Sequence, residues 1–185
     1  MKRRFTMSRR KKISIAVLFN LLLFLSVSLT AQEKQKTINW DHWKFLLGEW
    51  VGEGGGNVTG QGIGESKFFL DLDNNILVRE SYADFSASKD RPAYTHRDKM
   101  IIYQQASSSK AIYFDNEGHV INYEIKFSDD FNMITFLSEL IPGAPRFRLT
   151  YTRQKDDRIK LDFEIAPPNK PESFSPYLTA ISKRK

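Results

Sequence analysis

The sequence contains no cysteine among its 185 residues. This absence excludes disulfide bridges, thiolate metal sites and a cysteine nucleophile. It also excludes a lipid anchor of the kind attached to a cysteine at a signal cleavage point. An exported chain without disulfides depends on its hydrophobic core, and the aromatic residues, 13% of the sequence, are sufficient to build one.

Histidine is also scarce, with three residues in the whole chain, His42, His96 and His119. His42 lies in a short helical pattern and suits a surface or capping role. His96 and His119 flank strands that would be near neighbours, but no HxH or HxxxH spacing accompanies them. A third metal ligand would have to come from a nearby carboxylate, namely Asp98, Asp115 or Glu117. No metal site is predicted.

Sequence motifs for nucleotide binding and for nucleophilic catalysis are missing. Eight of the ten glycines lie between Gly48 and Gly64, yet no G-x-G-x-x-G or Gly-Lys-Ser/Thr motif is completed there, and a strand pattern follows instead of a helix. There is no G-x-S-x-G motif and no Ser/His/Asp arrangement that stands out. The glycines favour a bent strand, or a backbone that lies close to a ligand or to another segment.

The positive charge is confined to the N-terminus. The formal net charge is +6, but seven of the 28 basic residues lie within the first 31 residues, where no acidic residue occurs. The remainder has 21 basic and 22 acidic residues and is nearly neutral. A nucleic-acid partner is therefore not expected.

The first 31 residues have the pattern of a secretory signal peptide, with a basic stretch, an apolar run over residues 13–29 and the sequence TAQ. Cleavage after Ala31 would leave Gln32 first and no stable membrane anchor. A retained anchor is the alternative, although an apolar run of 17 residues is short for a membrane span. We expect an exported protein, periplasmic or extracellular, with a flexible lead-in at 32–38 and one domain at 39–185.

The domain begins with one short helical pattern and continues with strands. Trp40, Trp43, Leu46 and Leu47 have helical spacing, with Asn39 or Asp41 as the N-cap and Gly48 as the stop. From Glu49 onward apolar and polar residues alternate. Ten strands are predicted near 49–58, 63–72, 75–84, 97–105, 109–115, 119–128, 132–138, 145–154, 158–166 and 175–183.

Most strands are joined by short polar turns. In AIYFDNEGHVINY, the residues Asp115 to Gly118 suit a tight hairpin whose glycine takes a left-handed conformation. Two longer links, SASKDRPAYTH and APPNKPESFSP, are places where a ligand mouth could form. Sequential hairpins favour an all-β, closed, antiparallel up-and-down barrel of about ten strands, because closure removes exposed edges.

Several stretches resemble known families. FLLGEWVGEGGG is similar to the GxWxGxGxG opening of nitrobindin-type haem-binding barrels. KDRPAYTHRDKMIIY, AIYFDNEGHVINY and APRFRLTYTR resemble a bacterial lipocalin-like β-barrel family of unknown function. The likeness runs from about Trp43 to Lys183 and implies a lipocalin-like ten-stranded barrel.

The nitrobindin resemblance implies a haem pocket that includes residues 50–56. It also implies an iron-binding histidine in the last strand, but Tyr177 occupies that position here. A tyrosinate can bind ferric haem. The chemistry of a neutral proximal imidazole is not implied by this substitution.

Three functional hypotheses follow. The first is an exported barrel that binds a small apolar or amphipathic molecule. The second is a haem barrel acting on a small nitrogen or oxygen species, with Tyr177 or His119 as the iron ligand. The third is an interaction module with a packed interior. The predicted ligand-binding residues are Trp50, Tyr94, His96, Tyr113, His119 and Tyr177.

Overall fold

The computed structural model describes residues 38–53, 62–87, 89 and 92–185. Residues from Ile38 to Lys185 form a compact unit of their own. The predicted signal peptide, most of the predicted lead-in and part of the glycine-rich segment lie outside the described residues. Within the described part of the chain, no helix has the length and apolar character needed to cross a membrane.

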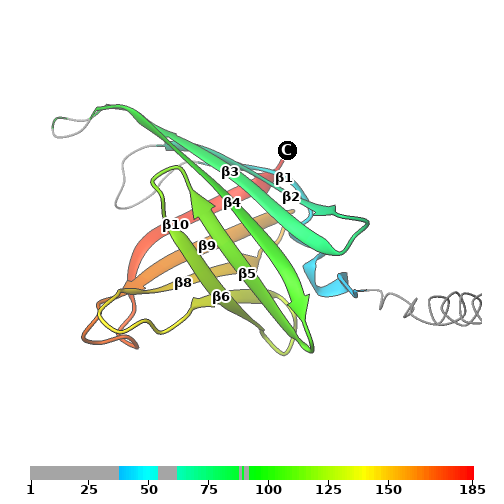
Figure 1. Ribbon diagram of the computed structural model, residues 1–185. Coiled ribbons are helices and arrows are strands. Elements are labelled where there is room, and N and C mark those ends of the chain that lie inside the picture. Colours follow the sequence, from blue (N-terminus) through cyan, green and yellow to red (C-terminus); the bar gives the residue numbers. More distant parts are fainter. Residues whose placement is uncertain (1–37, 54–61, 88, 90–91) are drawn as a thin grey trace, which may run out of the picture. The chain divides into compact units, whose positions relative to one another are not determined.

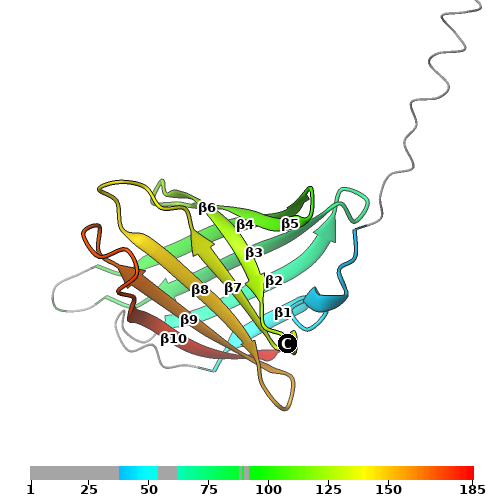
Figure 2. The ribbon, with the colours of Figure 1, turned by 90° about the horizontal axis from the view of Figure 1, so that it is seen from below.

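The unit is a closed barrel of ten antiparallel strands (Figures 1 and 2). Each strand pairs with the next one in sequence, and β10 pairs with β1 to close the barrel. The strands are β1 (Gly48–Gly52), β2 (Gly62–Asp71), β3 (Ile76–Phe85), β4 (Tyr94–Gln105), β5 (Ser108–Asp115), β6 (Val120–Phe127), β7 (Met133–Ser138), β8 (Arg146–Arg153), β9 (Arg158–Ala166) and β10 (Ser175–Arg184).

The predicted fold class is confirmed, and most strand boundaries lie within one residue of the prediction. The described part of the first strand ends at Gly52, and the rest of the predicted strand lies outside the described residues. The fourth strand begins three residues earlier than predicted, at Tyr94. In β10 the pairing register shifts between Pro176 and Leu178, which indicates a β-bulge.

The predicted short helix is a single 3₁₀ turn, η1 (Asp41–Trp43), rather than an α-helix. Its hydrogen bonds run from Trp43 N to Trp40 O and from Leu46 N to Trp43 O, each 2.9 Å long. Residues three apart lie on the same side of a 3₁₀ turn. This geometry brings Trp40, Trp43 and Leu46 to one face, and all three side chains are buried.

These three residues, which we call the N-terminal plug, close one end of the barrel. The indole of Trp40 donates a 2.8 Å hydrogen bond to Asn74 O in the β2–β3 turn. Trp43 packs edge-on against Phe127 at the end of β6, with ring centroids 5.2 Å apart. The turns β2–β3, β4–β5, β6–β7 and β8–β9 lie at this end, because all strands are antiparallel neighbours.

Gly48 ends the plug and begins β1. Its φ of +118° is a conformation that side-chain-bearing residues rarely adopt, and a Cβ atom there would lie 2.5 Å from Nη1 of Arg184. The glycine predicted to stop the helix thus allows the sharp change of direction into the barrel wall.

Candidate ligand-binding site

The end of the barrel opposite the plug carries the chemically informative side chains. The links β3–β4, β5–β6, β7–β8 and β9–β10 lie there, and Figure 2 shows the last two on the side away from η1. Inward-facing residues in the middle of the barrel are buried, and inward-facing residues near both ends are half-buried. We call the end opposite the plug the mouth.

A buried arginine lies on the inner face of β3. Arg79 is 5% exposed, and its guanidinium donates a 2.6 Å hydrogen bond to the Tyr151 hydroxyl and a further one to the Asp98 carboxylate. Its Nε is buried and has no hydrogen-bond partner within the described structure. Burial works against the charge of Arg79, but the nearby Asp98 carboxylate outweighs it and raises the pKa of the guanidinium.

A chain of polar side chains leads from Asp98 toward the mouth. His96 lies on the same face of β4, and its Nε2 is 3.1 Å from the Tyr113 hydroxyl of β5. That hydroxyl is also 3.2 Å from Oδ2 of Asp115, which in turn lies 2.8 Å from Nδ1 of His119. We refer to Arg79, His96, Asp98, Tyr113, Asp115 and Tyr151 together as the inner polar cluster.

The turn Asp115–Gly118 both connects two strands and supports this cluster. Oδ1 of Asp115 accepts hydrogen bonds from the backbone N–H groups of Glu117 and His119, and Gly118 has a φ of +92°. The carboxylate of Glu117 lies 2.9 Å from Nδ1 of His96. With the proton on Nδ1, His96 donates to Glu117.

Burial shifts the pKa values of several groups in the cluster. It raises the pKa of the Tyr113 hydroxyl well above its ordinary value, and the Asp98 carboxylate raises it further. Burial likewise raises the pKa of Tyr151. Both phenols therefore remain protonated at neutral pH. For Asp115 burial acts in the same direction, but the hydrogen bonds from His119 outweigh it and lower the pKa of the carboxyl group.

An aromatic wall faces the mouth from the other side of the barrel. The rings of Phe147 on β8 and Phe163 on β9 stack with centroids 5.9 Å apart. Tyr177, at the bulge of β10, packs edge-on against Phe163 at 5.8 Å. In the order of the strands, β9 and β4 are five steps apart in either direction, so the aromatic wall lies opposite the inner polar cluster.

The structure brings together some of the predicted site residues and separates others. His96 and Tyr113 belong to the inner polar cluster, and His119 joins it through Asp115. Tyr94 begins the same strand as His96 and stacks on Phe85 with centroids 4.7 Å apart.

Tyr177 and Trp50 lie elsewhere. Tyr177 belongs to the aromatic wall. Trp50 is buried against the plugged end, where its indole donates a 2.7 Å hydrogen bond to Leu46 O and the guanidinium of Arg184 covers its ring. A ligand contact at Trp50 stays a prediction.

The sequence did not point to Arg79 or Tyr151 as site residues. Arg79 lies in the stretch LVRESY, where apolar residues occur in both alternating phases. The inward phase therefore could not be chosen from β3 alone. On the next strand, Asp98 and His96 point to the same face, and this could have indicated a polar inner surface. Using it to place Arg79 would have required the pairing register between β3 and β4.

Neither metal nor haem is assigned to this site. No group of three histidine or acidic side chains able to hold a metal ion occurs among the described residues. A phenolate ligand to haem iron needs a neighbour that favours loss of its proton. Within the described part of the chain, Tyr177 contacts the ring of Phe163 and no ion pair or hydrogen bond engages its phenol. Haem binding at Tyr177 stays a prediction.

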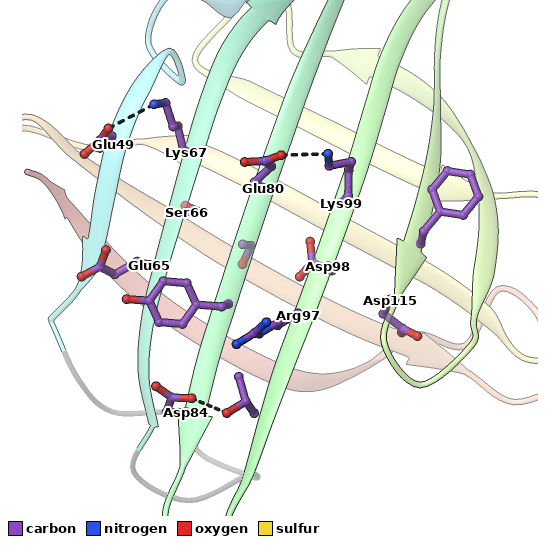
Figure 3. A pocket seen from close by; sticks show the side chains of 14 residues that line it. Glu49, Glu65, Ser66, Lys67, Glu80, Asp84, Arg97, Asp98, Lys99 and Asp115 are labelled. Carbon is purple, nitrogen blue, oxygen red and sulfur yellow. Dashed lines mark hydrogen bonds and ion pairs between the residues drawn. The ribbon is translucent and has the colours of Figure 1, made fainter.

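A second feature is a hollow of about 720 Å³ on the outer face of β1–β5 (Figure 3). Ion pairs between neighbouring strands cross it, Glu49 with Lys67 at 3.3 Å and Glu80 with Lys99 at 2.8 Å. Exposed pairs of this kind contribute little free energy. Arg97 lies on the same face, and its side chain has no ion pair or hydrogen bond within the described structure. Asp98 and Asp115 of the inner polar cluster also border the hollow, but most of its charged side chains are exposed.

No family model matches the chain, and no curated protein matches it. The proposed kinship with lipocalin-like or nitrobindin-like families therefore stays a prediction, and the function has to be argued from the geometry of the site.

We expect the acid stability of the protein to depend on Asp115. Because its pKa is lowered on folding, its carboxylate stabilises the fold above the unfolded pKa of about 3.9 and ceases to do so as the pH falls through the lower folded value. Asp115→Asn keeps an acceptor but cannot titrate. It should reduce the unfolding free energy at pH 7 by about 1–2 kcal/mol and flatten the loss of stability below about pH 4.

Urea unfolding at a series of pH values tests this expectation. Asp129→Asn, in the exposed β6–β7 turn, is the matched control and should leave the profile unchanged. An Asp115→Asn profile that parallels the wild type at acid pH would contradict the assignment.

Proposed function

We propose that the protein is a lipocalin-like barrel that binds a small amphipathic molecule at its mouth. The observation that supports this most is that an aromatic wall and the inner polar cluster lie on opposite sides of the mouth. One wall offers stacked, half-buried aromatic rings, and the other offers desolvated hydrogen-bonding groups. Binding sites for small molecules commonly combine a largely apolar lining with a few placed polar groups.

The charges of the polar wall indicate the headgroup. Asp98 lies beside the buried cation Arg79, and Asp115, which is paired with Asp98 across β4 and β5, adds a second carboxylate, so a further negative charge would be repelled. The Nε of Arg79 is a buried donor without a partner in the described structure, whereas the Tyr113 hydroxyl already donates to Asp115. A neutral acceptor such as a hydroxyl, carbonyl or amide group is therefore favoured over a carboxylate.

We propose further that the protein is exported. The support is the basic, then apolar, then small-residue pattern of residues 1–31. The N-terminal sequence of the protein isolated from its cells tests this proposal, and Gln32 is the expected first residue.

Titration of the barrel, residues 38–185, with N-phenyl-1-naphthylamine tests the ligand-binding proposal. This neutral aromatic probe fluoresces on leaving water, so binding should give a saturable, blue-shifted signal. Phe163→Ala should weaken binding about tenfold, because one aromatic contact is worth roughly 1–2 kcal/mol. A long-chain alcohol should displace the probe better than the corresponding carboxylate at pH 7.

Phe69→Ala provides the matched control, because Phe69 lies on the outer phase of β2 beside Lys67. Equal losses in the two variants would contradict binding at the mouth. No signal in the wild type would favour a packed interaction module instead. A Soret shift with hemin that is lost in Tyr177→Phe would replace the proposal with the haem hypothesis.

A further inference from the structure

An apolar stripe crosses the outside of the barrel at the rim of the mouth. It consists of Phe114, Val120, Leu140 and Ile141, whose exposed fractions range from 39 to 64%. Phe114 and Val120 are directly paired across β5 and β6. Phe114 and Val120 lie on the outward phase of β5 and β6, since the adjacent Tyr113 and Ile121 pack against the core, whereas Leu140 and Ile141 belong to the β7–β8 link.

The pairing of β6 with β7 continues for a short distance into the β7–β8 link. Beyond the end of β7, Glu139 N still donates a 3.1 Å hydrogen bond to Asn122 O. Continuing that antiparallel register by two residues places Ile141 opposite Val120. Phe114, Val120 and Ile141 therefore share the outer face, and Leu140, which falls opposite Ile121 in this register, is exposed beside them at the rim.

The tip of the stripe is uncharged. The link residues 140–145, LIPGAP, contain no charged or hydrogen-bonding side chain, and two bulky aliphatic side chains stand next to each other at its start. The acidic groups near the rim are engaged, Glu117 with His96 and Glu139 with the amide of Asn122. Such a tip enters the boundary of a lipid bilayer without burying a charge.

A basic side chain, Arg97, lies next to the turn that joins the two strands of the stripe. The backbone N–H of Arg97 on β4 donates to Oδ1 of Asn116, and its carbonyl accepts from the backbone N–H of Asn116, which lies in the turn between Phe114 and Val120. Figure 3 shows Arg97 on the outer face, and no partner engages its guanidinium within the described structure. A free guanidinium at this position complements the phosphate of a lipid headgroup.

The size of the stripe argues against a protein partner. Four partly exposed side chains offer a few hundred Å², about half of the roughly 800 Å² per partner in a stable protein interface. Insertion into a bilayer has no such minimum, because affinity grows with each apolar group that is buried.

We propose that the stripe docks the barrel on a lipid bilayer surface, with Leu140 and Ile141 inserted and Arg97 at the headgroups. This goes beyond ligand binding in solution and does not require it. The mouth would then lie next to the bilayer, from which apolar molecules could enter.

Co-sedimentation of the barrel, residues 38–185, with phosphatidylcholine vesicles, with and without phosphatidylglycerol, tests the proposal. The wild type should bind both and prefer the anionic vesicles. The double variant Leu140→Ser/Ile141→Ser should partition about tenfold more weakly into both kinds of vesicle. Arg97→Gln should lose about fivefold, only with phosphatidylglycerol, as expected for one basic residue near a charged surface.

Leu72→Ser is the matched control, since Leu72 is 63% exposed but lies in the β2–β3 turn at the plugged end. It should bind as the wild type does. Absence of vesicle binding, or an equal loss in Leu72→Ser, would overturn the proposal. So would a dimer that dissociates in the double variant, because the stripe would then be a protein interface.

Naphthylamine binding measured on the same variants separates the two proposals. The double variant should retain the probe, which also shows that it is folded. Vesicle binding without probe binding would refute the proposed function alone.

Discussion

Asp98→Asn is expected to lower the unfolding free energy by about 3–5 kcal/mol, because it removes the charge that compensates a buried guanidinium. The side chains of Asp98 and Arg79 are each only 6% exposed. The substitution preserves the side-chain volume and one hydrogen-bond acceptor. The loss of unfolding free energy therefore measures mainly the removal of the carboxylate charge. For a domain stable by roughly 5–15 kcal/mol, this is a large fraction of the total.

Urea unfolding of three variants measures this effect. Glu80→Gln is the matched control, since Glu80 is the next residue on β3 and its pair with Lys99 is about half exposed. It should change the unfolding free energy by less than about 1 kcal/mol. Adding Arg79→Met to Asp98→Asn should restore much of the loss, because no uncompensated charge remains buried.

A result in which Asp98→Asn costs no more than Glu80→Gln would mean that water reaches the guanidinium. The inner polar cluster would then be solvated, and the proposal that it forms a desolvated side of the binding site would be contradicted. The same experiment therefore bears on both stability and the proposed function.

Trp43→Ala is expected to be the other severe substitution, with a loss of about 3–5 kcal/mol. The indole is 1% exposed and makes edge-on contacts with the rings of Trp40, Phe127 and Phe136. Its removal leaves a void where the plug meets the barrel. The surrounding strands cannot close this void, because their pairing fixes their spacing.

Thermal and urea unfolding should show this loss, with Lys44→Ala as the control. Lys44 follows Trp43 directly, and its pair with Asp41 is exposed, so its removal should matter by less than about 0.5 kcal/mol. If Trp43→Ala unfolded like the wild type, the plug would not belong to the cooperative core. Naphthylamine binding by folded Trp43→Ala should persist, because the proposed site lies at the opposite end.

The fold could be predicted from the sequence because its signals are local. Alternation along each strand and turn residues between strands specify sequential hairpins, and closure follows from the need to pair the two edge strands. The short N-terminal helix was also predicted, and the structure gives it as a single 3₁₀ turn. Trp40, Trp43 and Leu46 are spaced by three, which suits a 3₁₀ turn, but Leu47 also completed an α-helical pattern.

The candidate site was only partly predictable. His96, Tyr113 and His119 were selected for their chemistry, and the structure joins them through Asp115. Arg79 was not selected, since its inward position depends on register rather than on the residues around it.

The sequence by itself determined the absence of cysteine chemistry, the near-neutral domain, the number and order of the strands, and the turn at Asp115–Gly118. These properties depend on composition and on residues close together in the chain. Only the tertiary structure decided that Arg79, Asp98 and Tyr151 meet, although Arg79 and Tyr151 are 72 positions apart. It also decided that Phe163 faces them from across the barrel. The reason is that barrel closure and strand register place residues from distant strands at one end, and no local pattern encodes that placement.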